Sequence, residues 1–148
     1  QASVAASSSV TGPQAAVQPF CDTWCRDPQS LSVAAQACVG HRYGTNGYAL
    51  DYQAMNRSCA QAAVLGDATA QTLLGEIHFL GLGVNQDFTL AYQWYQQAAA
   101  QQHAHAELMM YEMTRLHLVA TAAQPQQWLQ RAAQNGHPQA RLLLQAAL

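Results

Sequence analysis

Apolar residues recur at a three-to-four spacing through residues 70–102, which places their side chains on one face of an α-helix. Gly81 and Gly83 interrupt the pattern, and Asp87 follows at a position where its side chain can cap a second helix. The stretch therefore predicts a hairpin of two amphipathic helices. Because a hairpin this short does not bury its apolar face alone, we expect further helices to stack on it.

The chain repeats this hairpin on both sides. Residues 106–110 repeat the pattern of the first helix at a shift of about 36 residues, a period typical of helical arrays. After a shorter loop, residues 128–133 match residues 94–99. Upstream, residues 39–40 match residues 74–75. The sequence therefore predicts an array of related hairpins.

The central copy has a distinctive order of residues. Leu74 and Gly75 are followed by the turn 81–84 with the sequence Gly-Leu-Gly-Val, then by Trp94-Tyr95 and Ala98-Ala99. This pattern resembles the Sel1-like repeat, a helical hairpin related to the tetratricopeptide repeat. The resemblance covers residues 31–148. It implies an all-α fold, an α-α solenoid or superhelix of about three Sel1-like hairpins followed by a C-terminal capping helix.

The copies depart from the family pattern at particular positions. The central copy has His78 where a tyrosine is usual. The first copy carries Arg57 and Ser58 near the Trp-Tyr site, and the third has Tyr111 in place of the glycine and lacks the Gly-x-Gly turn. The central copy is therefore the most specific of the three.

The resemblance and the composition together divide the chain. Residues 1–18 are low in charge and rich in Ala, Ser and Val, which predicts a disordered tail or linker. Residues 19–30 form a cysteine-bearing N-terminal cap segment, and residues 31–148 form the repeat domain. Its units are expected at 31–66, 67–102 and 103–136, with a cap helix at 137–148. Helices are expected at about 31–43, 50–65, 68–80, 88–101, 104–118, 125–135 and 138–148.

Charge and composition exclude some functions and indicate a location. The formal net charge is −2 and only 9% of residues are charged, so the chain lacks the basic surface that nucleic acid requires. No apolar run approaches the ~18 residues of a membrane span. The first residue is Gln and the tail is rich in small residues. This favours a mature periplasmic or secreted protein whose signal peptide has been removed, although a fragment of a longer protein has the same appearance.

The four cysteines lie in the first part of the chain, at Cys21, Cys25, Cys38 and Cys59. An even number in an exported chain predicts two disulfides. In one arrangement Cys38 and Cys59 pair across the first hairpin and Cys21 pairs with Cys25. In the other, both bonds cross from the N-terminal segment to the first repeat. The second is slightly favoured, because Cβ vectors one helical turn apart are nearly parallel. A zinc site is a further alternative, although the usual C-x2-C spacing is absent.

No residue pattern indicates catalysis, a metal or a cofactor. His103 and His137 share the junction position that precedes a first helix, where a polar residue is useful. His103 and His105 stand two residues apart, so in a helix they point to different faces. We find no Ser-His-Asp order, phosphate loop or paired carboxylates. The sequence therefore predicts a protein without enzymatic activity, catalytic residues, cofactor or metal site.

A stacked array offers a concave surface lined by the first helix of each hairpin. Between the packing residues of these helices lie apolar and charged side chains that suit a protein or peptide partner. The residues expected in this groove are His41, Thr72, Glu76, Phe79, Leu108, Glu112 and Arg115.

The resemblance implies that this protein mediates protein–protein interaction, as an adaptor or scaffold of the cell envelope or the secreted space. Some cysteine-rich Sel1-like proteins are described as penicillin-binding or β-lactamase-like. That gives the alternative function, an envelope protein that binds or hydrolyses β-lactams or peptidoglycan fragments. Those proteins link neighbouring hairpins by cysteine pairs, whereas this chain has no cysteine after Cys59.

Overall fold

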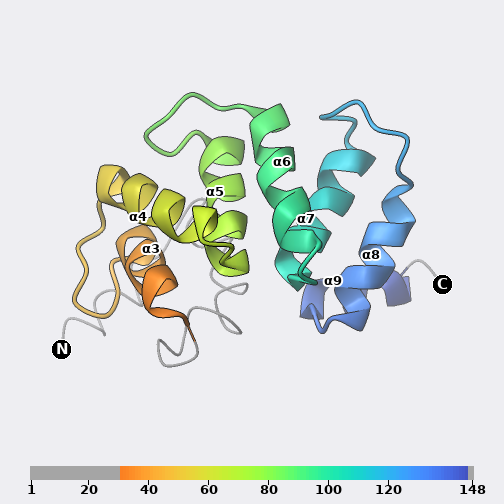
Figure 1. The fold of residues 1–148 in the computed structure, drawn as a ribbon. Coiled ribbons are helices and arrows are strands. Elements are labelled where there is room, and N and C mark those ends of the chain that lie inside the picture. Colours follow the sequence, from red (N-terminus) through yellow and green to blue (C-terminus); the bar gives the residue numbers. More distant parts are fainter. Residues whose placement is uncertain (1–30, 147–148) are drawn as a thin grey trace.

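The computed structural model describes residues 31–146, and the regular structure in this range is α-helical. The helices pair in sequence as α3/α4, α5/α6 and α7/α8, and α9 packs on α8 (Figure 1). This is the predicted α-α solenoid. Within the described range no helix is long and apolar enough to cross a bilayer. The helices are α3 (Val33–Tyr43), α4 (Tyr52–Val64), α5 (Ala68–Leu80), α6 (Phe88–Ala99), α7 (Ala104–Arg115), α8 (Pro125–Gln134) and α9 (Pro138–Ala146).

Short polar side chains determine where several helices begin. Ser32, Asp67 and Asp87 each accept a hydrogen bond from a backbone N–H in the first turn of the helix that follows. Gly81 ends α5 with a φ of 73°, a left-handed conformation that glycine adopts without strain. The helices agree with the predicted ranges except at their ends. For example, α7 ends at Arg115 because the chain turns through a positive φ of 57° at His117.

The core is a row of three apolar clusters shared between neighbouring hairpins. The first joins α3, α4 and α5, the second joins α6 and α7, and the third joins α7, α8 and α9. Trp94 of α6 packs against the first cluster and Trp128 of α8 packs against the second. Each of these second helices therefore contacts the preceding part of the array through its tryptophan. The central helix α5 is the most enclosed, and every residue from 70 to 77 is buried.

Within the central hairpin, α5 and α6 approach closely at Gly75. A β-carbon at this position would lie 2.5 Å from the ring of Tyr95, which is itself fully buried. In the third hairpin the sizes are exchanged, because Tyr111 stands at the glycine position and Leu129 at the tyrosine position. Both contribute to the third apolar cluster. The two hairpins thus fill the same place in the packing with the larger side chain coming from opposite helices.

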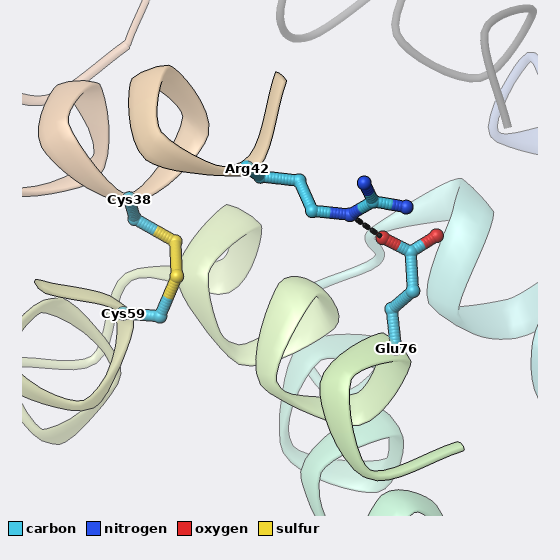
Figure 2. Close-up of polar contacts among 4 residues, drawn as sticks. All are labelled: Cys38, Arg42, Cys59 and Glu76. Atoms are coloured by element: carbon cyan, nitrogen blue, oxygen red, sulfur yellow. Dashed lines mark hydrogen bonds and ion pairs between the residues drawn. A yellow bond between two sulfur atoms is a disulfide. The ribbon is translucent and has the colours of Figure 1, made fainter. Parts of the chain in front are cut away.

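The first hairpin solves the same problem with a loop residue and a disulfide. Tyr48, from the loop between α3 and α4, covers Gly40 so closely that a β-carbon there would lie 2.2 Å from its ring. Cys59 follows Asp51 by the same number of residues as Tyr95 follows Asp87. At this position Cys59 bonds to Cys38 of α3, with the two Cα atoms 4.6 Å apart (Figure 2). In the first hairpin the aromatic ring therefore comes from the loop, and a disulfide stands where the central hairpin has Tyr95.

This bond corrects the slightly favoured prediction that both disulfides cross from the N-terminal segment. Cys38 and Cys59 face each other across the antiparallel helices, within the Cα separation that a disulfide requires. The pairing of Cys38 with Cys59 also excludes a zinc site that uses these two thiols. Cys21 and Cys25 lie outside the described residues, as do the predicted tail and cap segment.

We predict that Gly75→Ala destabilises the protein by about 1–3 kcal/mol, because the new methyl group overlaps the Tyr95 ring more than the gain in helix propensity offsets. Tyr95→Leu removes the overlapping ring and gives this position the leucine found in the third hairpin. Adding Gly75→Ala to Tyr95→Leu is therefore expected to cost less stability than adding it to the parent. Urea unfolding followed by circular dichroism measures both effects. A Gly75→Ala protein as stable as the parent would contradict the packing argument.

We predict that replacing Cys38 and Cys59 by alanine lowers the free energy of unfolding by about 2–4 kcal/mol, because the disulfide restricts the unfolded chain. Chemical unfolding without reductant measures the loss. The matched control is Cys21→Ala with Cys25→Ala, which retains Cys38–Cys59 and is expected to lose a similar amount of stability when reductant is added. If reductant has no effect on this control, the bond contributes nothing to stability.

Candidate functional site

A buried ion pair connects the first two hairpins on the side of their first helices. Arg42 Nε of α3 donates to Glu76 Oε1 of α5 at 3.0 Å (Figure 2). The two residues are only 1% and 5% exposed. Because the partners come from different hairpins, their attraction depends on the stacking of α3 on α5. The pair is therefore a polar connection that selects one arrangement of these hairpins.

The surroundings act on the two charges in opposite ways. Burial raises the pKa of Glu76, and the adjacent Arg42 guanidinium counteracts this. Burial lowers the pKa of Arg42, but the Glu76 carboxylate outweighs it, so the pKa is raised overall. Arg42 therefore stays positively charged, and its charge is what makes a carboxylate tolerable at position 76.

Two phenols belong to the same electrostatic environment. The hydroxyl groups of Tyr43 and Tyr95 are buried and have no hydrogen-bond partner. Burial raises the pKa of each phenol well above its ordinary value, and the negative charge of Glu76 adds to the effect. The Arg42 guanidinium also lies 4.8 Å from the centre of the Tyr43 ring. The centre of the site is thus one ion pair surrounded by neutral aromatic groups.

Three of the residues predicted to line a partner groove, Thr72, Glu76 and Leu108, are buried within the fold. The Glu76 carboxylate accepts a hydrogen bond from Arg42. Thr72 is 1% exposed; its hydroxyl donates to the Ala68 carbonyl and lies 3.0 Å from His103 Nδ1. Leu108 is 2% exposed and belongs to the third apolar cluster. At these positions the first helices face other parts of the protein, so the side chains serve packing.

The other four predicted groove residues keep part of their surface exposed. His41 is half-buried, and its Nδ1 lies 2.9 Å from the Ala49 carbonyl oxygen. Phe79 is half-buried against Phe88, with the ring centres 5.3 Å apart. Glu112 and Arg115 form an ion pair within α7, and their side chains are 27% and 48% exposed. The exposed members are thus spread over the C-terminal halves of α3, α5 and α7.

Sequence reasoning missed Arg42, although the alignment of the repeats contained a signal. When Tyr43 is matched with His78, Arg42 falls on Ile77, which is buried at 1% exposure. A charged residue at a position that another repeat buries calls for a partner of opposite charge. Glu76 meets that requirement from the next hairpin. The role of Arg42 could be recognised only by considering two repeats together.

The described residues contain no group of three or more His, Cys, Asp or Glu side chains placed to hold a metal ion. The polar side chains brought together here are the Arg42–Glu76 ion pair and the Thr72 hydroxyl on the first helices, with the buried phenols of Tyr43 and Tyr95 beside the pair. The ion pair and the hydroxyl make hydrogen bonds within the protein. Within residues 31–146, the buried groups of this region therefore stabilise the fold, and partly exposed side chains lie beside them.

Stacked antiparallel hairpins of this length define a tetratricopeptide-like α-α solenoid. The Sel1 repeat family pattern matches residues 68–103 and 126–137. These segments cover the central hairpin and part of the last one. These matches and the similar solved structures support a Sel1-like repeat protein.

Solved structures with this fold are similar over most of the chain. A Sel1 repeat protein from Oxalobacter formigenes is 26% identical with a TM-score of 0.67, over 77% of this chain and 46% of that one. A protective antigen of uropathogenic Escherichia coli with an SLR fold is 25% identical with a TM-score of 0.67, over 88% of this chain and 28% of that one. This chain thus spans less than half the length of either protein. No curated protein sequence matches it.

We predict that Arg42→Ala destabilises the protein by about 3–5 kcal/mol, because it leaves the buried Glu76 carboxylate without its counter-charge. Removing both charges with Arg42→Met and Glu76→Leu is expected to cost far less than the single change. Thermal and urea unfolding of the parent, Arg42→Ala, Arg42→Met, Glu76→Leu and the double variant measure this coupling. Independent, additive effects of the two substitutions would contradict the proposed role of the pair.

Proposed function

We propose that this protein is an adaptor or scaffold that binds a protein or peptide partner in the cell envelope or the secreted space. Sel1 repeats are generally protein-interaction modules, and this chain is built from them. The Cys38–Cys59 bond supports an oxidising compartment, because disulfides persist there and are rare in reducing ones. The proposal assigns partner binding to the exposed ends of the first helices.

The observation that carries this assignment is the difference between Glu112 and Glu76, which occupy equivalent positions. Glu76 is buried against an arginine from the preceding hairpin. At the position equivalent to Arg42, the preceding hairpin of Glu112 has Ile77, so no arginine reaches across. Glu112 instead pairs with Arg115 in its own helix and remains partly exposed. A carboxylate and a guanidinium are thereby presented together on α7.

A half-buried tyrosine and an exposed leucine lie beside these charges. The Arg115 guanidinium is 5.8 Å from the centre of the Tyr111 ring, and Leu116 is 49% exposed. Aromatic residues and arginine dominate the energetics of many protein interfaces. We therefore propose that Tyr111, Glu112, Arg115 and Leu116 form the centre of the partner surface, with Phe79 and His41 extending it along α5 and α3.

We predict that Glu112→Arg abolishes partner capture, because it removes the carboxylate and places a second positive charge beside Arg115. The immobilised parent protein is used to capture partners from a native envelope extract under non-reducing conditions. Binding of the purified partner is then measured by calorimetry, and a loss of about tenfold or more in affinity is expected.

The matched control is Gln96→Arg, which adds an arginine at an exposed position of α6 and should leave binding unchanged. Equal binding by the Glu112→Arg and parent proteins would refute the assigned surface, and capture of no partner by the parent would count against an adaptor role. Nitrocefin turnover by the same purified protein would support the alternative, β-lactamase-like function.

A further inference from the structure

Two buried histidines meet where the last described helix begins. His137 immediately precedes α9, and its Nδ1 accepts hydrogen bonds from the backbone N–H groups of Gln139 at 3.2 Å and Ala140 at 3.4 Å. His137 Nε2 lies 3.4 Å from Nδ1 of His105 in α7, and the two rings stack. The residues are 5% and 4% exposed. His137 thus caps one helix and contacts another at the same time.

This geometry fixes the protonation state of His137. A nitrogen that accepts two N–H groups carries no proton, so the neutral ring has its proton on Nε2 and donates it to His105 Nδ1. Protonation of His137 would place an N–H on Nδ1, facing the backbone donors and the positive end of the α9 dipole. An imidazolium therefore loses the cap. The contact with His105 likewise requires an unprotonated Nδ1 on that ring.

The repeat supplies an internal comparison at the same position. Asp67, His103 and His137 each stand immediately before the first helix of a hairpin, α5, α7 and α9 respectively. Asp67 caps α5 through its carboxylate, which accepts from the Ala70 N–H. A carboxylate keeps this role at a pH where a histidine cap is lost. The substitution of Asp by His thus makes the start of α9 sensitive to acid while the start of α5 is not.

We propose that the His105–His137 contact is an acid-sensitive latch, which holds α9 on the array at neutral pH and releases it when the imidazoles are protonated. Leu143 and Leu144 of α9 pack on the third apolar cluster, and Arg141 Nε donates to the Ala133 carbonyl. Release of α9 would uncover the apolar surface formed by Leu108 and Leu129. The device therefore couples pH to the exposure of one end of the solenoid.

The charged and titratable groups around the latch come from several helices. His103 lies beside it at the start of α7, with Asp67 acting on it from the start of α5. Glu107 of α7 accepts from Asn135 and is near Arg131 of α8, and Arg141 belongs to α9 itself. Asp67 favours a protonated His103, whereas protonation of any one histidine opposes protonation of the others.

The pKa values have the direction that the latch needs. Burial lowers the pKa of His137 to about 4. It lowers the pKa of His103 to about 4 and that of His105 well below its ordinary value, and the neighbouring histidines add to both shifts. The folded state binds protons at these histidines less tightly than the unfolded state does. The stability that the neutral histidines contribute is therefore complete above about pH 6.5 and is lost as the pH falls toward 4.

Hydrogen exchange with mass spectrometry tests the latch between about pH 7.5 and pH 5, after correction for intrinsic exchange rates. In the parent protein, protection of residues 138–146 is expected to fall by about tenfold or more while protection of α5 changes little. In His137→Asn the helix keeps a capping side chain that does not titrate, so the fall should be clearly smaller than in the parent, with only His103 and His105 left to titrate. His137→Asp, which copies Asp67, serves as a second variant if the asparagine protein folds poorly.

The proposal is overturned if α9 protection in the parent is independent of pH, or if it falls equally in a folded His137→Asn or His137→Asp protein. Nuclear magnetic resonance titration of the parent provides a direct readout. The proposal requires a pKa for His137 below the ordinary value of about 6.5, and an ordinary pKa would overturn it.

Discussion

Close approach between the two helices of each hairpin is the constraint on which the array depends. In the central hairpin Gly75 allows it, because the Tyr95 ring occupies the space that any other side chain at position 75 would need. Once α5 and α6 are this close, residues 70–77 of α5 are enclosed and little solvent-facing surface remains on the central helix. The neighbouring hairpins meet the same constraint with other residues: Gly40 under Tyr48 with the Cys38–Cys59 bond in the first, and Tyr111 with Leu129 in the third. Each hairpin thus fills the space between its two helices, but the residues that fill this space differ from one hairpin to the next.

Polar side chains add specificity to this apolar packing. Arg42 binds Glu76 between the first two hairpins, and His105 contacts His137 between α7 and the start of α9. Both contacts lie in buried surroundings where an unsatisfied group is costly, so they penalise a shifted arrangement of the hairpins more than apolar contacts do. Apolar clusters supply most of the favourable free energy, whereas these buried contacts determine which helices face each other.

The sequence predicted the helices because their signals are local. Asp67, Asp87 and Gly81 act within one helical turn, and the repeated apolar spacing is visible without knowledge of any neighbour. The helix ends near His117 and Gln102 were less predictable, because both residues adopt a positive φ although neither is a glycine. The environment of Glu76 and Thr72 could not be predicted from one repeat. It depends on Arg42 and His103, which lie 34 and 31 residues away.

This dependence on neighbours also explains how a repeat protein can acquire a functional surface without a change of fold. Glu76 and Glu112 occupy equivalent positions on equivalent helices, yet their side chains are 7% and 27% exposed. The difference originates one hairpin earlier, where Arg42 is replaced by Ile77. The residue in one repeat thus determines whether a carboxylate in the next repeat is buried in an ion pair between hairpins or keeps part of its surface exposed. For this protein, the search for interaction residues should therefore begin at first-helix positions whose preceding hairpin offers no counter-charge.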